Sequence, residues 1–185
     1  MNVRKQPELN GMTQLELRVF LEGIGEPSFR AKQLFAGIHK RRLDSFDLFT
    51  DLPKTLRERL KAEANPVSLE IGRVFNSSDG TRRFLLELRD GLEVETVFMP
   101  EERRDTICIS SQVGCPLACD FCVTGVLGLM RNLSVGEIVS QVISVLNEVF
   151  GVGATPEHPT NIVIMGMGEP LLNYDNVMKA VRLFN

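Results

Sequence analysis

The sequence predicts an α/β fold: the start of a partial (β/α) barrel, preceded by a small helical domain and a short antiparallel β meander. Apolar residues recur at helical spacing through residues 1–64 and at alternating positions through residues 65–100. Residues 101–185 then follow the order strand, helix, strand, helix, which begins a barrel and is too short to close one. We therefore expect a helical accessory domain, a β-rich linker and the N-terminal part of a barrel.

Three amphipathic helices are expected in residues 1–64. The first covers residues 13–22 and ends at a pair of glycines, and the second and third open near Pro27 and Pro53. The apolar positions expected to form their buried faces are Leu15, Val19, Leu21, Phe29, Leu34, Phe35, Ile38, Leu56 and Leu60.

The net charge of −3 hides an asymmetry along the chain. Residues 1–64 hold 12 Lys and Arg against 9 Asp and Glu, whereas the remaining residues hold 9 against 15. The basic residues are densest at His39–Arg42 and at Lys54–Lys61. Such a face could meet a phosphate backbone, and an ordinary solvated helix face is the alternative interpretation.

Residues 68–76, 81–88 and 92–99 alternate between apolar and polar side chains, with turn residues between them, which predicts three antiparallel strands. Glu93 and Glu95 share one face of the last strand. A solvent-facing carboxylate pair is the ordinary interpretation of this pattern.

The last part of the chain has the pattern of two strand–helix units. A short strand covers residues 106–110, and Ser134 with Glu137 forms a capping box that opens a helix ending near Phe150. The continuous apolar run at residues 161–167 predicts a parallel strand buried on both faces, and residues 176–184 predict a closing helix.

We expect the protein to be located in the cytoplasm and to have no membrane partner. No run of eighteen uncharged apolar residues is present, and the N-terminal stretch MNVRKQPELNG lacks the apolar segment of a secretory signal. In that compartment, cysteines are expected to be thiols or metal ligands rather than structural disulfides.

All four cysteines fall within fifteen residues, from Cys108 to Cys122. Cys115, Cys119 and Cys122 have the spacing CxxxCxxC on a loop directly after a strand, so three thiolates are expected to converge. A structural zinc normally takes four protein ligands, usually from two separated pairs. A 4Fe-4S cluster can be held by three thiolates with one iron left open to a small molecule, which favours redox chemistry.

This cysteine motif, on the loop after the first barrel strand, resembles that of the radical S-adenosylmethionine superfamily. The resemblance implies that Cys115, Cys119 and Cys122 bind a 4Fe-4S cluster whose open iron binds S-adenosylmethionine. The segment Met165–Pro170, MGMGEP, is similar to the superfamily's GGEP motif, although Met167 replaces its first glycine. Gly168 and Glu169 are then implied to hold the amino group of the methionine moiety, and helix capping is the alternative role for Glu169.

Longer stretches resemble the adenosine-C2 RNA methyltransferases, which act on 23S rRNA and tRNA. The stretches that carry this resemblance are residues 29–60, 94–100, 108–125, 131–142 and 162–177. The resemblance implies an RNA-binding role for the helical domain and an electron donor such as flavodoxin.

The resemblance also implies a mechanism, because carbon C2 of adenine is not nucleophilic. One S-adenosylmethionine methylates a carrier cysteine, and a second yields a deoxyadenosyl radical that activates the S-methyl group. The protein–RNA crosslink is then resolved as a disulfide. Cys108 matches the resolving cysteine and Glu95 the residue that removes the proton, with their division of labour open. A buried small residue or a fourth metal ligand is the alternative for Cys108.

The carrier cysteine of the family lies near its C-terminus, and this chain has no fifth cysteine. We therefore expect these residues to be catalytically incomplete by themselves. Two rival interpretations remain: an adenosine-C8 rRNA methyltransferase with the same cysteines, and a non-catalytic RNA-binding module with zinc on all four cysteines.

Overall fold

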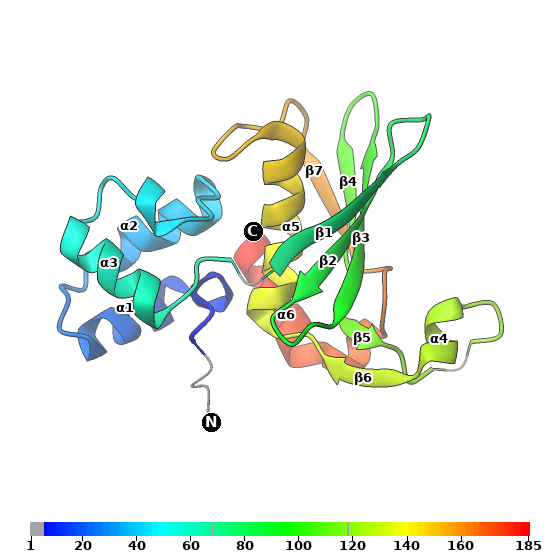
Figure 1. Ribbon diagram of the computed structural model, residues 1–185, viewed down its shortest axis with the longest axis horizontal. Helices are drawn as coiled ribbons and strands as arrows, with labels where there is room; N and C mark the ends of the chain where they lie inside the picture. The colour runs from blue at the N-terminus through cyan, green and yellow to red at the C-terminus, as the bar shows by residue number, and fades with distance from the viewer. Residues whose placement is uncertain (1–5, 68, 118) are drawn as a thin grey trace.

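The computed structural model describes residues 6–67, 69–117 and 119–185. A helical unit lies beside an α/β unit in which helices pack against a twisted sheet (Figure 1). The predicted first residue of the meander, Ser68, lies outside the described residues, as does Ala118 of the cysteine motif.

The three predicted N-terminal helices are confirmed. Thr13 caps the first of them in a full capping box with Glu16, so this helix begins at Gln14 rather than at Thr13. The elements of the unit are η1 (Leu9–Gly11), α1 (Gln14–Gly23), α2 (Arg30–Phe35), the π-helical turn η2 (Ala36–Lys40), η3 (Phe46–Leu48) and α3 (Lys54–Glu63). The predicted positions that are buried in its core are Leu21, Leu34, Ile38, Leu56 and Leu60.

Three positions of the predicted apolar faces are wrong: Leu15, Val19 and Phe29 are each about 60% exposed. On α1 the buried residues are Leu17 and Leu21, which are four apart and share one side of the helix. Leu15 and Val19 each lie two residues from this pair, and two residues turn an α-helix by about 200°, onto the opposite side. Phe29 precedes α2 and lies outside its buried face.

The three-stranded meander is confirmed and continues into the strand before the cysteine loop. A five-stranded sheet has the order β1-β2-β3-β4-β7, antiparallel from β1 to β4 and parallel between β4 and β7. Its strands are β1 (Leu69–Asn76), β2 (Arg82–Leu88), β3 (Glu93–Pro100), β4 (Asp105–Cys108) and β7 (Thr160–Val163). Strands β1, β2 and β3 therefore share one sheet with β4 and β7 of the part of the chain that follows them.

The last strand differs from its prediction. β7 ends at Val163 instead of Met167, and its residues are half-buried or exposed rather than buried on both faces. Within the described chain β7 is an edge strand that pairs only with β4, so its other edge has no neighbour. Beyond β7 the chain continues alongside the residues that follow β4, where the amide of Gly166 donates to the carbonyl of Ile109 at 3.0 Å.

The connection after β4 holds three elements that the sequence did not predict. A two-stranded antiparallel pair, β5 (Gln112–Gly114) and β6 (Leu129–Asn132), brackets the short helix α4 (Val123–Leu127). The predicted helices α5 (Val135–Phe150) and α6 (Tyr174–Phe184) are confirmed, with the capping box of Ser134 and Glu137 on α5. Among the described residues, no helix has both the length and the apolar character that crossing a membrane requires.

The helical unit contacts both ends of α5. At the start of α5, the Glu8 carboxylate accepts a hydrogen bond from the Ser134 hydroxyl at 2.5 Å. The side-chain amide of Asn10 donates to the carbonyl of Gly136 at 2.6 Å. At its end, the side chains of Arg42 and Asn147 pair at 3.2 Å. These contacts attach residues 8–42 to the α/β unit at two separate points.

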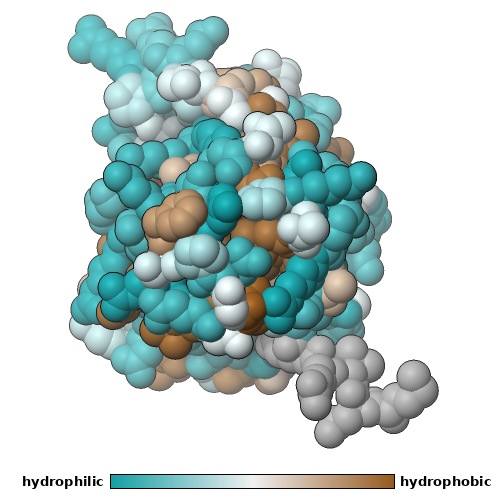
Figure 2. Space-filling model, turned by 90° about the vertical axis from the view of Figure 1, so that its left-hand side faces the viewer, coloured by the Kyte–Doolittle hydropathy of each residue, from teal (hydrophilic) through white to brown (hydrophobic). Residues whose placement is uncertain are grey.

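The basic stretches are largely engaged within the molecule. Arg42 is buried, Arg41 pairs with Asp51 at 2.9 Å, and Lys61 pairs with Asp47 at 2.6 Å. Figure 2 views the molecule from the side of the helical unit, and hydrophilic side chains cover most of that face around hollows of hydrophobic surface. Arg42 folds inward, so neither a phosphate-binding face nor a solvated helix face at this stretch includes it.

Candidate functional site

The pairing of β3 with β4 places Glu95 and Cys108 on one face of the sheet. Cys108 lies directly opposite Val97, so these two side chains point to the same side, and Glu95 shares that side because it is two residues from Val97. The alternate residues Val94 and Thr96 are buried on the opposite face, which α5 covers. The strand register thus brings two predicted site residues together on the uncovered face.

Cys108 is the last residue of β4 and is half-buried. Burial raises the pKa of the thiol, and the backbone N–H of Met165 opposes part of this rise by donating to the sulfur. The thiol is therefore mostly protonated at neutral pH and must lose its proton before it can attack another sulfur. Cys108 also lies next to the turn that follows β7.

Glu95 lies on the uncovered face and is paired with Arg83 of β2. The guanidinium of Arg83 donates to the Glu95 carboxylate at 2.7 Å, and each side chain is almost half exposed. Glu93 is also exposed, so both carboxylates face outward. The Glu95 carboxylate is thus accessible from outside, with the Arg83 cation beside it and over the ring of Phe75.

The segment Met165–Pro170 packs tightly against the chain that follows β4. A Cβ atom at Gly166 would lie 2.7 Å from the Ser110 hydroxyl oxygen. A Cβ at Gly168 would lie 2.5 Å from the Cβ of Gln112, and the φ of Gly168 is +99°. Both positions therefore require glycine, and Met167 occupies the one position between them that accepts a side chain.

Glu169 uses its side chain to cap the short helix η4 (Pro170–Asn173). One carboxylate oxygen accepts a hydrogen bond from the amide of Leu171 at 3.0 Å, and the Glu169 amide donates to the side chain of Gln112 at 2.8 Å. The side-chain amide of Gln112 in turn donates to Asn132 at 2.7 Å. This arrangement shows the capping role, and it fixes the main chain of Gly168 and Glu169 against β5.

The three cysteines of the CxxxCxxC motif differ in their surroundings. Cys115 is buried, and its amide donates to the carbonyl of Gly128 at 3.1 Å, just beyond the β5–β6 pair. Cys119 is exposed, and Cys122 is half-buried as the N-cap of α4. Hydrogen bonds from the backbone of Gly125 and then Thr124 lower the pKa of the Cys122 thiol.

The donor chemistry of this loop fits a cysteine-ligated iron–sulfur cluster. Cys108, Cys115, Cys119 and Cys122 are all free thiols. These cysteines do not form a closed set of metal ligands, because no three His, Cys, Asp or Glu side chains among the residues described lie close enough to hold a metal ion. The predicted convergence of three thiolates is thus absent from the described part of the loop, which projects from the sheet near α4 (Figure 1).

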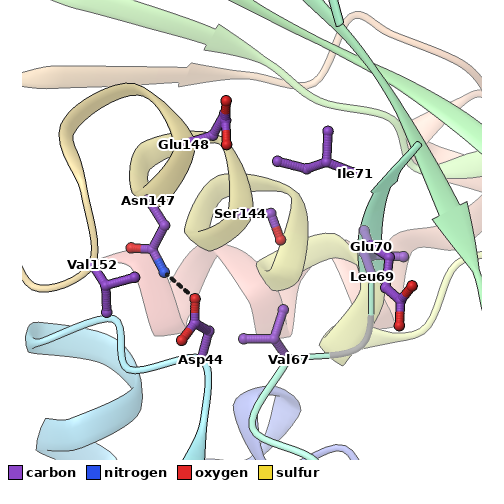
Figure 3. Close-up of a pocket in the computed structure, with 9 residues that line it drawn as sticks. All are labelled: Asp44, Val67, Leu69, Glu70, Ile71, Ser144, Asn147, Glu148 and Val152. Atoms are coloured by element: carbon purple, nitrogen blue, oxygen red, sulfur yellow. Dashed lines mark hydrogen bonds between the residues drawn. The ribbon is translucent and has the colours of Figure 1, made fainter. Parts of the chain in front are cut away.

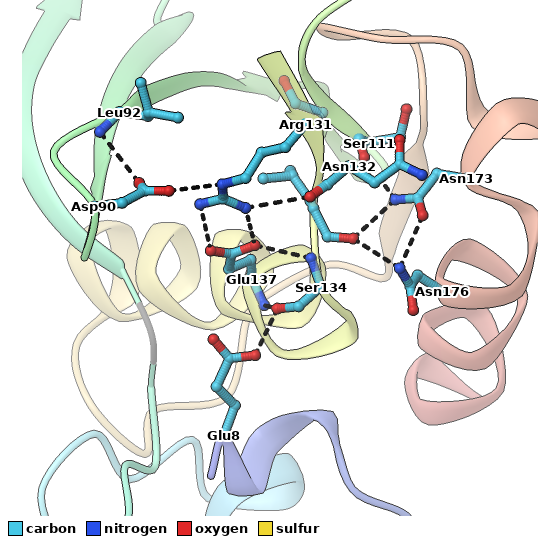
Figure 4. Close-up of polar contacts among 12 residues, drawn as sticks. Glu8, Asp90, Leu92, Ser111, Arg131, Asn132, Ser134, Glu137, Asn173 and Asn176 are labelled. Carbon is cyan, nitrogen blue, oxygen red and sulfur yellow. Dashed lines mark hydrogen bonds and ion pairs between the residues drawn. The ribbon is translucent and has the colours of Figure 1, made fainter. Parts of the chain in front are cut away.

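A polar network that the sequence did not reveal holds the base of this loop. Arg131 on β6 donates to both carboxylate oxygens of the buried Glu137, at 2.8 and 2.9 Å, and to Asp90 at 2.7 Å. Asn173 donates to the carbonyls of Ser111 and Leu133, both at 2.8 Å (Figure 4). The network ties β6, the start of α5 and η4 together.

One open cavity lies elsewhere, between α5, β1 and the helical unit, with a volume of about 500 Å³. Its lining includes Asp44, Glu70 and Glu148, and Asp44 accepts a hydrogen bond from Asn147 (Figure 3). None of the predicted site residues lines it. The candidate site is therefore the uncovered sheet face with the two loops at its edge.

Comparison with known proteins gives concordant matches. A family model described as the ribosomal RNA large subunit methyltransferase N-terminal domain matches residues 7–65. The dual-specificity RNA methyltransferase RlmN of Halorhodospira halophila is 47% identical over 96% of this chain and 48% of its own length. The protein of that name from Pseudomonas fluorescens is 46% identical over 95% of this chain and 46% of its own length.

A solved structure is also similar to this chain. The crystal structure of a radical SAM methyltransferase from Sphaerobacter thermophilus matches with a TM-score of 0.88 and 41% identity. The match covers 95% of this chain and 51% of that one. The chain thus spans about half the length of the relatives it matches. By sequence, this chain is similar to the dual-specificity RNA methyltransferases named RlmN over about half of their length, and by structure it is similar to a radical SAM methyltransferase.

Proposed function

We propose that this chain forms part of a radical S-adenosylmethionine RNA methyltransferase that methylates carbon C2 of adenosine in 23S rRNA and tRNA. The observation that carries the proposal is the position of two loops. The cysteine loop follows β4, and the segment Met165–Pro170 follows β7. Because these strands are neighbours and parallel, both loops leave the same edge of the sheet, where barrel enzymes bind their ligands.

Within this proposal, Cys115, Cys119 and Cys122 are the ligands of a 4Fe-4S cluster. With S-adenosylmethionine bound, the cluster would supply the radical chemistry that an unreactive aromatic carbon requires. Gly168 and Glu169 would hold the amino group of S-adenosylmethionine. The amides of the turn are held rigidly by Gln112 and Ser110, which supports a binding role for its main chain. Glu169 would have to release the Leu171 amide to use its carboxylate.

Glu95 and Cys108 would complete the reaction on the RNA. Glu95 would accept the C2 proton after separating from Arg83. The thiolate of Cys108 would attack the carrier sulfur and form a disulfide as the bond between that sulfur and the methylene carbon breaks, and the released carbon would take up a proton to become the methyl group. Because this sheet face is uncovered, an adenine of the RNA could approach Glu95 and Cys108 from the same side. The raised pKa of Cys108 means that the thiol must lose its proton before it attacks the carrier sulfur.

The remaining assignments complete the proposal. Residues 1–64 would act as an RNA-binding accessory domain, residues 65–100 as a β-rich linker, and residues 101–185 as the first part of a partial barrel. An electron donor such as flavodoxin would reduce the cluster in the cytoplasm. The match of residues 7–65 to a ribosomal RNA methyltransferase domain supports the first assignment.

The test is to map the methylated carbon in 23S rRNA and tRNA from cells that express the gene. We expect methylation at C2, which is abolished by Cys108→Ala and reduced at least about a hundredfold by Glu95→Gln. The matched control is Glu93→Gln, which removes a carboxylate from the same strand face and should leave methylation unchanged. Methylation at C8 would support the adenosine-C8 enzyme instead, and an unmodified RNA would overturn both.

A further inference from the structure

We propose that Gln141, in the middle of α5, is a positioning residue that aligns the Met165–Pro170 turn with the strand that carries Glu95. It acts through Ser110 and touches neither the proposed ligand nor the RNA. This inference rests on the proposed function of that turn and deepens it. It is carried by hydrogen bonds among five residues, of which Gln141, Ser110 and Thr96 are completely buried.

Gln141 is a polar residue on the apolar side of α5, among Ile138, Val142 and Val145. A buried amide is tolerated only when its groups are paired. The side-chain oxygen of Gln141 accepts hydrogen bonds from the Ser110 amide at 2.7 Å and from the Thr96 hydroxyl at 2.9 Å. Its side-chain nitrogen donates to the Ser110 carbonyl at 2.9 Å. Gln141 therefore holds both backbone groups of Ser110.

Ser110 passes this constraint on through its hydroxyl group. The hydroxyl donates to the carbonyl of Glu95 at 2.6 Å and accepts from the amide of Met167 at 2.9 Å. One oxygen atom thus joins β3, at the residue with the proposed base, to the turn proposed to hold S-adenosylmethionine. Gly166 permits this approach, since a Cβ there would contact the same oxygen.

The position of Ser110 explains why its backbone groups need the side chain of Gln141 as their hydrogen-bond partner. β4 ends at Cys108, so the backbone of Ser110 lies beyond the β3–β4 and β4–β7 pairing. Gln141 supplies the donor and the acceptor that neighbouring strands supply earlier in β4. Without Gln141, Ser110 could shift, and the Met167 amide and the Glu95 carbonyl would no longer share one fixed partner.

The first experiment measures amide hydrogen exchange in this chain for Gln141→Leu and Ser110→Ala. Gln141→Leu should speed exchange at both Ser110 and Met167 at least about tenfold, relative to amides of the sheet core. Ser110→Ala should speed exchange at Met167 alone, because Gln141 still holds the Ser110 amide. Should Gln141→Leu fail to fold, Ser110→Ala still tests the link from Ser110 to the turn through exchange at Met167.

Asn147→Leu is the matched control, because it removes an amide side chain from the same helix. Asn147 pairs with Arg42 of the helical unit, far along α5 from Ser110. The control should leave exchange at Ser110 and Met167 unchanged. Unaltered exchange at Met167 in both Gln141→Leu and Ser110→Ala would overturn the inference and would leave the proposed function intact.

The second experiment measures binding of S-adenosylmethionine and of RNA to the reconstituted intact protein. Gln141→Leu should weaken S-adenosylmethionine binding about tenfold and leave RNA affinity unchanged, and Asn147→Leu should alter neither. A merely structural role of Gln141 would weaken the binding of both ligands together, and that result would overturn the positioning role. Faster exchange at Met167 with unaltered S-adenosylmethionine affinity would instead overturn the proposed function of the turn.

Discussion

Cys108 and Glu95 lie on adjacent strands with their side chains on the same uncovered face of the sheet, because Cys108 is paired with Val97 of β3. This relationship joins a thiol whose pKa is raised by burial to an accessible carboxylate. The two residues are thirteen positions apart in the sequence and belong to different strands, so only the strand register brings them together. The register therefore supports the pair's proposed joint role in releasing the product.

Reactivity of the thiols should reflect their burial. At pH 7.5, iodoacetamide should modify the exposed Cys119 much faster than Cys108, which is half-buried and mostly protonated. The rate at Cys108 should continue to rise above pH 9, since its pKa is raised from the ordinary value. Peptide mapping by mass spectrometry measures each site separately, and equal rates in the folded chain would contradict the burial of Cys108. Unfolding in urea is the control that should equalise them.

Gly168→Ala should destabilise the fold strongly. The residue has a φ of +99°, and a Cβ there would overlap the main chain and Cβ of Gln112. We expect a loss of at least about 2 kcal/mol in the free energy of unfolding, measured with urea. Gly91→Ala is the matched control, with a φ of +77° and open space around it, and should cost about 1 kcal/mol. Equal losses would contradict the close packing of the turn.

Arg131→Met should destabilise the protein by about 3 kcal/mol, because it leaves the buried carboxylate of Glu137 without its cation. Asp90→Asn removes the other, more exposed partner of Arg131 and should cost less than about 1 kcal/mol. Chemical denaturation of both variants measures the difference. A cost for Asp90→Asn as large as that for Arg131→Met would show that burial of Glu137 is not the source of the effect.

Stability should decrease in mild acid because of His39. Burial lowers the pKa of this imidazole to about 4, from an ordinary value of 6.5, although a backbone hydrogen bond with Met12 opposes the shift. The unfolded chain therefore binds the proton first as pH falls, and stability is lost between pH 6.5 and 4. At pH 5 the loss from this group should be about 2 kcal/mol. Unfolding of His39→Leu at pH 7.5 and pH 5 measures it, and an unaltered pH dependence would refute the assignment.

The fold was largely predictable where a local pattern determines the structure. The alternation in residues 81–99 and the capping box of Ser134 and Glu137 each specify their element through neighbouring residues. The pattern failed at β7, where an apolar run predicted burial on both faces. Burial there depends on a second neighbouring strand, which is a property of the sheet and not of the segment.

The candidate site was predictable in its residue types and not in its geometry. Cysteine spacing predicts Cys115, Cys119 and Cys122 as ligands, and this stays a prediction, whereas the environments that distinguish the three thiols come from Gly128 and α4. The pairing of Gln141 with Ser110 was missed because these two residues are thirty-one positions apart in the sequence. A single glutamine inside the apolar run IVSQVISVL was the available signal. Long-range hydrogen bonds of this kind leave no periodic trace in a sequence.

The most direct test of the account is anaerobic iron–sulfur reconstitution of this chain, followed by electron paramagnetic resonance of the reduced protein with and without S-adenosylmethionine. The account predicts a reduced 4Fe-4S signal that changes when S-adenosylmethionine is added, and that is lost in Cys119→Ala but retained in Cys108→Ala. A colourless protein with stoichiometric zinc on the four cysteines would contradict it and favour an RNA-binding zinc module.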